Sequence, residues 1–511
     1  MDEKIEHNSR KQVKWATVVS YIAIILNIIA GLIYTPWLII HIGDSNYGIY
    51  SIVTSIITML IMDFGISEAV AKYVAQYRTE GKENEIGSLL GLVLKIYLLL
   101  SIIFLIIFIF FYFMVEHIYV GLTATEISKL KQAYIIVAAY NVIAFTFTPL
   151  SGIMLAYEHL INLKLADILN KILVIVISAI AILLGGELMA VVIANAMAGI
   201  VTIIYKLLVI QKNHHFKIDI RYNNRKLLKE ILKFSVWIAI MVIAQRCIYS
   251  ITPSILGALS NSKEVTYFSL ASTLEGYAYS FGSVIAGLYL ARLTRILLAD
   301  DKNAFNRLIV KVGKLQYVLI LLIFVGFICV GDSFVYMWMG EGYSKVYYCT
   351  ILMLMPDMLL WPFMIPATGL TVLNKVKEYS LVHVIMAVIN MVLEAIFANR
   401  YGAIGAAVGI CTATIIKAFL VMVVYKRHLP IDMMGFVKQV FLPYGLGAGV
   451  ALVLSRLVLN NVASAVNSWG AVLLKGLITS TIYIMCICII GVIFDKETRE
   501  TVSKMFIRRE K

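Results

Sequence analysis

Residues 96–114 read IYLLLSIIFLIIFIFFYFM, nineteen residues without a charge. A helix needs about 20 apolar residues to cross the hydrocarbon core of a bilayer. This stretch therefore predicts a transmembrane helix, and the chain contains fourteen stretches of this kind. The predicted spans are approximately 15–40, 47–74, 88–114, 132–157, 164–184, 188–210, 232–258, 265–293, 315–338, 347–373, 379–399, 402–425, 436–458 and 470–494.

The composition of the whole chain also indicates a membrane protein. Of its 511 residues, 61% are hydrophobic and 14% are charged, against about 45–50% and about 25% in soluble domains. A fold so poor in polar residues cannot cover its surface for water, which excludes a soluble enzyme, a secreted disulfide scaffold and a disordered chain. The apolar runs are continuous and not alternating, which excludes a β-barrel. We expect an all-α polytopic membrane protein.

Lysine and arginine residues orient the predicted spans. If both termini are cytoplasmic, the cytoplasmic connections hold 35 of the 44 positive residues and the outer connections hold five. Cytoplasmic loops of membrane proteins carry such an excess. The net charge of +14 is then a topology signal and a contact for anionic lipid headgroups, and no nucleic-acid partner is expected. We predict a multi-pass protein of the cell membrane.

The sequence repeats weakly at an offset of 217 residues. Proline and glycine recur at this offset, where they mark kinks and close helix contacts. The matches pair Thr35-Pro36 with Thr252-Pro253, Phe64-Gly65 with Phe281-Gly282, and Pro149-x-x-Gly152 with Pro366-x-x-Gly369. Each repeat holds six spans, an even number, so the two repeats enter the membrane the same way up. Transporters built in this way bind substrate between two lobes and alternate access by rocking.

The repeat predicts four parts of the chain. They are an N-terminal six-helix lobe at 1–210, a basic cytoplasmic linker at 211–231, a second six-helix lobe at 232–430, and an extra helix pair with a basic cytoplasmic tail at 431–511. No connection is long enough to fold as a separate domain, so function must lie within the membrane or at its faces. A duplicated scaffold without transport stays open as an alternative.

The segment Asp63-Phe64-Gly65-Ile66-Ser67-Glu68-Ala69-Val70 resembles a signature of the polysaccharide (oligosaccharidyl-lipid) flippases. These belong to the multidrug/oligosaccharidyl-lipid/polysaccharide exporter superfamily. Three later segments are similar to further motifs of that family: Gly340-x-Gly342-Tyr343, Asn374-Lys375 and Gly402-x-x-Gly405-Ala406-Ala407. The resemblance covers nearly the whole chain. The resemblance implies a cavity lined by spans 1, 2, 7 and 8. It also implies a substrate of undecaprenyl diphosphate carrying an oligosaccharide. Branches with twelve and with fourteen spans occur, so the branch stays open.

Charged residues within the predicted spans are candidates for the substrate site, because a charge at mid-membrane costs about 2.5–3.5 kcal/mol. Arg246 lies at the centre of span 7, where a guanidinium can hold a diphosphate or sugar acid with two parallel hydrogen bonds. Its structural alternative is an ion pair, and Glu275 in span 8 is the natural partner. Glu275 is equally a candidate to take up a proton or Na⁺. Tyr249 and Tyr277 share these spans and are candidates to stack on sugar rings.

Three further carboxylates are candidates for coupling or gating. Asp63 and Glu68 lie toward the inner end of span 2, and their structural alternative is a role in folding, such as pairing with Arg78. Asp357 lies in span 10 between Pro356 and Trp361-Pro362, where prolines predict a kinked or broken helix. Such breaks free backbone carbonyls and serve as hinges in transporters.

We predict a flippase that carries lipid-linked oligosaccharide from the inner to the outer leaflet by alternating access, for cell-surface polysaccharide. Membrane lipids, a coupling proton or Na⁺, and other polysaccharide assembly proteins are its candidate partners. No catalytic, cofactor or metal motif is present, and without a Walker motif ATP is not the direct driver. The alternatives are a cation-coupled multidrug exporter of the same superfamily and, less favoured because the outer loops are short, a membrane glycan polymerase or ligase.

Overall fold

The computed structural model describes residues 24–213, 218–373, 375–462 and 468–494, so residues 15–23 of the first predicted span lie outside it. Helices make up nearly all of the described residues, and no strand occurs among them. The chain forms two compact units, Met1–Thr266 and Tyr267–Lys511. The prediction of an all-α polytopic protein is confirmed. The four-part division at 210, 231 and 430 stays a prediction.

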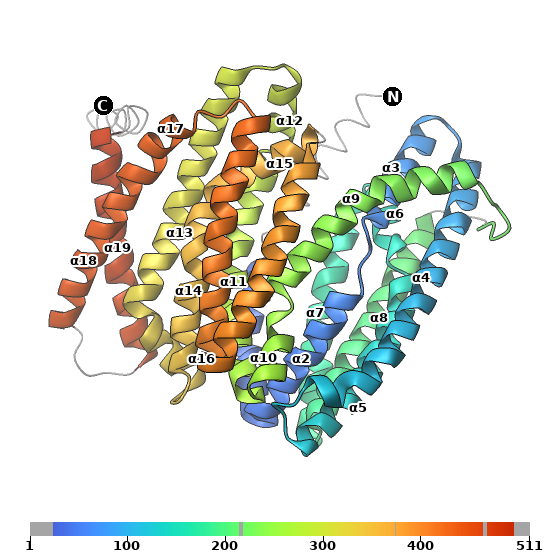
Figure 1. Cartoon of the computed structure of the whole chain (residues 1–511), viewed down its shortest axis with the longest axis horizontal. Helices are drawn as coiled ribbons and strands as arrows, with labels where there is room; N and C mark the ends of the chain where they lie inside the picture. The colour runs from blue at the N-terminus through green and yellow to red at the C-terminus, as the bar shows by residue number, and fades with distance from the viewer. Residues whose placement is uncertain (1–23, 214–217, 374, 463–467, 495–511) are drawn as a thin grey trace. The chain divides into compact units, whose positions relative to one another are not determined.

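The first unit consists of a helix at Ile24–Ile42 followed by nine labelled helices (Figure 1). These are α2 (Asp44–Leu60), α3 (Ile66–Thr79), α4 (Glu83–Ile118), α5 (Ala124–Thr146), α6 (Pro149–Ala156), α7 (Leu160–Leu183), α8 (Leu188–Asn213), α9 (Arg225–Tyr249) and α10 (Thr252–Leu259). Helix α11 (Ser262–Leu288) begins in this unit and continues into the second.

The second unit is built around the long helix α13 (Lys302–Met339), which packs against α14, α18 and α19. Its other helices are α12 (Leu290–Leu298), α14 (Ser344–Leu360), α15 (Met364–Val372), α16 (Val376–His428), α17 (Met433–Phe436), α18 (Leu442–Val462) and α19 (Trp469–Phe494). A 3₁₀ turn, η1 (Trp361–Phe363), joins α14 to α15, and a π-helical turn, η2 (Val437–Phe441), joins α17 to α18. The hydrophobic core of the unit includes the buried aromatic residues Trp361, Phe363 and Phe436.

In the described part of the chain, ten helices are long and apolar enough to cross a membrane, or twelve if each of two bent pairs is one span. This differs from the predicted fourteen. Helix α16 counts once although it covers the predicted spans 379–399 and 402–425. The chain reverses at Gly402 (φ 58°, ψ −134°), and because the residues on both sides of it are helical, the two halves count as one helix. A Cβ on Gly405 would lie 2.0 Å from the Phe397 carbonyl oxygen, so the two halves of α16 run back along one another.

The predicted second span, 47–74, is also divided. It breaks into α2 and α3 at residues 61–65. Ile61 is extended (φ −88°, ψ 114°) and ends α2 after 17 residues. Phe64 (φ 54°) and Gly65 (φ 73°) then take left-handed conformations directly before α3 begins, and glycine adopts this conformation without steric cost.

The exposed side chains of α4 show how these helices meet lipid. Leu99, Ile102, Ile106, Phe110 and Phe113 are each 57–68% exposed and recur every three or four residues. This spacing places them on one face of the helix. An apolar face of this length is costly in water and favourable in hydrocarbon, so α4 presents it to the membrane.

Helix boundaries recur along the chain close to the predicted offset of 217. The long helices α4 and α13 begin at Glu83 and Lys302, and the short helices α6 and α15 begin at Pro149 and Met364. The hairpin halves of α16 correspond in the same way to α7 and α8. The recurrence of long, short and paired helices in one order agrees with a duplicated six-span element.

Candidate functional site

Arg246 lies in the last turn of α9 and is half-buried. Its Nη1 donates to the Thr58 carbonyl oxygen at 2.5 Å, near the end of α2 where a carbonyl has no helical partner. In the described part of the chain no carboxylate forms an ion pair with Arg246. One Arg246 nitrogen therefore fixes the side chain, and its remaining N–H donors are available to an anion.

The predicted pairing of Arg246 with Glu275 joins residues of different units and stays a prediction. So do the roles of the two tyrosines. Tyr249 ends α9 with 48% of its side chain exposed, and Tyr277 is half-buried in α11. The ring of Tyr249 is thus accessible for stacking, as the sugar-binding prediction requires.

Asp63 holds the start of α3. Its Oδ2 accepts from the Ser67 backbone N–H at 2.9 Å, and its Oδ1 accepts from the Tyr97 hydroxyl of α4. A carboxylate at this position satisfies a backbone donor left free at a helix N-terminus. The contacts of Asp63 agree with the folding alternative for this residue, and its coupling role stays a prediction. Glu68 lies in α3, and its side chain lies outside the described residues.

Arg78, the other residue of that folding alternative, is held by α6. Its Nη1 donates to the Ala156 carbonyl oxygen at 2.6 Å, and its guanidinium lies 4.3 Å from the ring centroid of Tyr157. Close packing of the same two helices explains one glycine of the repeat, because a Cβ on Gly152 would lie 2.4 Å from the Ser67 carbonyl oxygen.

A pair of carboxyl groups forms the centre of a polar cluster in the second unit. Glu275 on α11 and Asp357 on α14 interact electrostatically, and Asp357 is only 6% exposed. Asp357 Oδ2 has no hydrogen-bond partner among the described residues. Two adjoining buried carboxyl groups repel one another when both are ionised, so a proton or cation bound between them would lower their electrostatic energy.

The negative charge of the pair has a buried counter-charge. Lys417 on α16 is 4% exposed, and it interacts with Asp357 and with Tyr379. Buried charges are stable only when paired, so Lys417 is the counter-charge that this carboxyl pair has within the unit. The Trp361 indole N–H also interacts with Asp357, although not in full hydrogen-bond geometry.

Prolines shape the backbone on which Asp357 lies. Pro356 lies inside α14, and Pro362 lies in the η1 turn that follows. Each proline lacks an N–H, so a carbonyl one turn earlier loses its helical partner. The predicted break of span 10 is found at this point, between α14 and α15.

His383 is a member of this cluster that sequence reasoning missed. It is 3% exposed within α16, it interacts electrostatically with Lys417, and its Nδ1 lies 2.9 Å from the Tyr379 carbonyl oxygen. The Nδ1 hydrogen therefore bonds the backbone, which leaves Nε2 as the nitrogen that can exchange a proton. No sequence signal separates His383 from the other histidines near predicted span ends.

A cavity of about 740 Å³ lies within the first unit. Its polar lining comes mainly from α7 and α8, with Lys171 and Asn170 on α7 and Thr202 and Lys206 on α8. Asp167, also on the lining, lies 3.4 Å from Lys164 in an i, i+3 ion pair. Asp167 also attracts Lys206, but the lysines on the lining outnumber this one carboxylate, so Lys171 and Lys206 leave the cavity with a net positive charge.

The two lysines differ in their contacts. Lys206 Nζ donates to the Ser151 hydroxyl at 3.0 Å, while the ammonium of Lys171 has no partner among the described residues. Intramembrane cations are costly and face a bundle interior or a polar cavity. Both residues are among the 35 positive residues that orient the chain, although both fall inside the predicted spans 164–184 and 188–210. That position within an apolar run is the signal that could have identified them.

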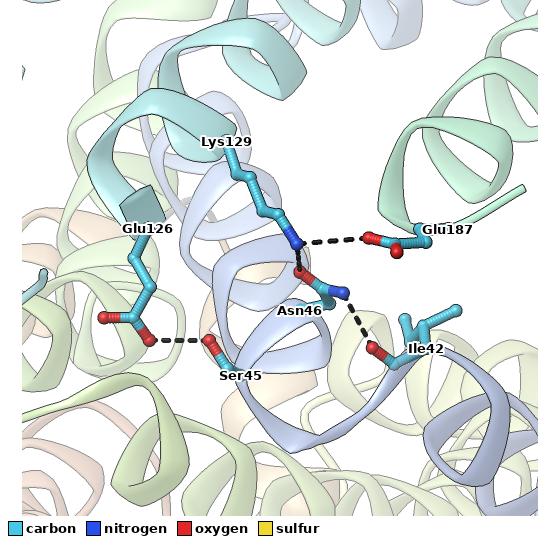
Figure 2. A network of polar contacts seen from close by, with 6 residues as sticks. All are labelled: Ile42, Ser45, Asn46, Glu126, Lys129 and Glu187. Carbon is cyan, nitrogen blue, oxygen red and sulfur yellow. Dashed lines mark hydrogen bonds and ion pairs between the residues drawn. The ribbon is translucent and has the colours of Figure 1, made fainter. Parts of the chain in front are cut away.

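A second polar network joins helix starts in the first unit (Figure 2). Lys129 on α5 donates to the Asn46 side chain and pairs with Glu187, both at 3.1 Å. Glu126, in the first turn of α5, accepts from the Ser45 hydroxyl at 2.6 Å and from the Ser262 hydroxyl of α11. The network ties α2, α5 and the start of α11 together at the predicted outer face.

Residues 15–291, just over half of the chain, match the family model described as polysaccharide biosynthesis protein. No curated protein sequence matches.

Among solved structures, one described as lipid II flippase MurJ in an inward closed conformation is similar, with a TM-score of 0.67 at 16% identity over 93% of this chain and 99% of that one. An inward-facing multidrug resistance MATE family transporter of the MOP superfamily gives 0.64 at 12% identity over 81% and 99%. A MOP superfamily transporter from Pyrococcus furiosus gives 0.58 at 15% identity over 82% and 95%. At these identities the similarity shows the fold.

Proposed function

The chain belongs to the polysaccharide biosynthesis protein family, and we propose that it is a flippase of polyprenyl diphosphate-linked oligosaccharide. The glycan-diphosphate head would cross the cell membrane from the cytoplasmic to the outer leaflet by alternating access, while the polyprenyl tail stays in lipid. Both termini would be cytoplasmic, as the distribution of lysine and arginine predicts.

The observation that carries the proposal is the basic, polar cavity of the first unit. Lys171 and Lys206 supply positive charge there, and Asn170 and Thr202 supply hydrogen-bonding side chains. A diphosphate needs cations in a low-dielectric environment, and a glycan needs donors and acceptors for its hydroxyl groups. Arg246 belongs to the same unit and retains free donors. This chemistry suits an anionic sugar and disfavours an organic cation.

We place the coupling step at the carboxyl pair of the second unit. Two adjoining buried carboxyl groups favour holding one proton between them, and Lys417 would balance the remaining negative charge. Loss of that proton, or its replacement by Na⁺, changes the charge that the buried cluster must balance. Either event would bias the unit between conformations, since buried ion clusters are stable only when balanced.

The test is translocation of undecaprenyl diphosphate oligosaccharide in proteoliposomes, measured as glycan accessible to an impermeant reagent. A double substitution, Lys171→Gln with Lys206→Gln, should raise the half-saturating concentration about tenfold or more, because each charge-assisted hydrogen bond contributes about 1.5–3 kcal/mol. Arg246→Ala should abolish flipping in protein that still inserts.

Lys212→Gln is the matched control, because it removes a lysine from the exposed end of the same helix α8. Equal flipping by the double variant and this control would remove the cavity from the mechanism. If the wild-type protein instead moves organic cations and none of several glycan lipids, the multidrug-exporter alternative is correct.

A further inference from the structure

A second basic cavity, of about 650 Å³, lies in the second unit, separate from the carboxyl cluster. It opens between the first turns of α13 and the segment that runs from α17 through η2 into α18. Arg307, Lys311 and Lys314 line it from α13. Their i, i+4, i+7 spacing places them on one helix face. Arg292 on α12 and Lys438 on η2 complete the lining cations.

The charge of this cavity is not balanced by its own carboxylates. The lining holds five lysine and arginine residues and one acidic residue, Asp432. An Asp432 Oδ1 is already engaged, because it accepts from the Gly435 backbone N–H at 2.9 Å as the cap of α17. Convergent like charges repel one another, so the cavity favours an anion that can accept from several of them.

The backbone around the cavity is fixed before any ligand binds. The Asn306 side chain donates to the Pro430 carbonyl oxygen at 2.6 Å and accepts from the Asp432 N–H at 2.9 Å. The Phe436 ring packs so closely on α13 that a Cβ on Gly313 would lie 2.7 Å from it. A π-helical turn then carries Lys438. Such turns are rare and are enriched at functional sites, where they re-aim side chains.

Exposed apolar side chains flank the basic cavity. Leu315 follows Lys314 on α13, and Met434, Val437 and Leu442 lie along the opposite segment, each 42–64% exposed. These side chains give the acyl chains of a lipid an apolar surface beside the cavity, which a soluble phosphate would not use. A phospholipid matches both features at once, because its phosphate is anionic and its acyl chains are apolar.

We propose that this cavity binds the headgroup of an anionic phospholipid of the cytoplasmic leaflet. The phosphate is held by Arg307, Lys311 and Lys438, and the acyl chains lie along Leu315 and Leu442. The leaflet follows from the predicted topology, in which the start of α13 and the start of α18 are cytoplasmic. The proposal is independent of the transported substrate, because no residue of the first unit takes part.

The test measures lipid binding by the full-length protein in detergent, with native mass spectrometry and thermal shift. The probes are dioleoyl phosphatidylglycerol, dioleoyl phosphatidylcholine and glycerol phosphate. The triple substitution Arg307→Gln, Lys311→Gln, Lys438→Gln should weaken phosphatidylglycerol binding at least tenfold. The matched control, Lys377→Gln, Lys426→Gln, Arg427→Gln, removes three exposed cations from the same unit and the same predicted face and should leave binding unchanged.

Single substitutions keep the proposal testable if the triple variant does not fold. Lys311→Gln and Lys438→Gln lie on different elements, and each should weaken phosphatidylglycerol binding several-fold while helicity and elution volume stay unchanged. Equal phosphatidylglycerol binding by wild type and variants overturns the proposal. Equal binding of phosphatidylcholine also overturns it. Competition by glycerol phosphate at the lipid's own concentration would show a site for free phosphate and refute the lipid assignment.

Discussion

Glu126 offers the sharpest test of how the first unit is held together. Its carboxylate accepts from Ser45 and Ser262 on two other helices and also closes a capping box with Thr123. Removing the capping box costs about 1 kcal/mol, and each hydroxyl–carboxylate hydrogen bond contributes about 1.5 kcal/mol. The half-exposed position reduces these values through solvent screening. We expect Glu126→Ala to lower the free energy of unfolding by about 3 kcal/mol.

The assay is reversible unfolding of the purified protein in a denaturing detergent. Glu116→Ala is the matched control, because Glu116 also pairs with a residue of α5, Lys131 at 2.5 Å, but on the exposed surface. Exposed ion pairs contribute little to stability, so its loss should be far smaller. A double-mutant cycle with Ser262→Ala should show a coupling energy above about 0.5 kcal/mol. Equal losses in Glu126→Ala and Glu116→Ala, or strict additivity in the cycle, would refute the reasoning.

Three further predictions concern other parts of the chain. Gly402→Ala should destabilise the protein by about 1–3 kcal/mol, since a side chain is strained at φ 58°, whereas Gly449→Ala, where a Cβ meets nothing within 4 Å, should not lower the unfolding midpoint. Burial, with Arg78 nearby, lowers the pKa of His159 from its ordinary 6.5. The free energy of unfolding should therefore fall as pH falls below about 6.5, and His159→Gln should reduce this dependence on pH. Asp357→Asn should abolish the dependence of transport on pH or Na⁺, measured in proteoliposomes with imposed gradients. The control Glu378→Gln, at the surface beside His428, should retain this dependence. If both variants retain it, the coupling role of Asp357 is refuted.

Most of the membrane-spanning helices could be predicted from the sequence because hydropathy over about 20 residues is a local property. The break between α2 and α3 was not, since Ile61 and Met62 continue the apolar run, and only the extended backbone of Ile61 ends α2. The segment beginning at Asp63 was identified from its resemblance to a family motif. In the structure the Asp63 carboxylate accepts hydrogen bonds from the Ser67 N–H at the start of α3 and from the Tyr97 hydroxyl, which explains a structural need for this residue.

The site was less accessible to sequence reasoning, for two physical reasons. The electrostatic interaction between Glu275 and Asp357 joins helices that are far apart in the chain, and no periodicity in the sequence predicts such a pairing. Lys171 and Lys206 were counted for orientation, and a count of charges does not say whether a side chain faces lipid, water or a cavity. Arg246 was identified because its depth in an apolar run is itself the signal.

The reversal at Gly402 has a consequence for how the chain is made and handled. Because the two halves of α16 are joined by a single glycine, no polar loop separates them during synthesis. We expect the insertion machinery to receive them as one helical hairpin, so that neither half can be oriented without the other. The same junction offers no room for an epitope tag or protease site, and reporters of topology should be placed in the connections on either side of α16 instead.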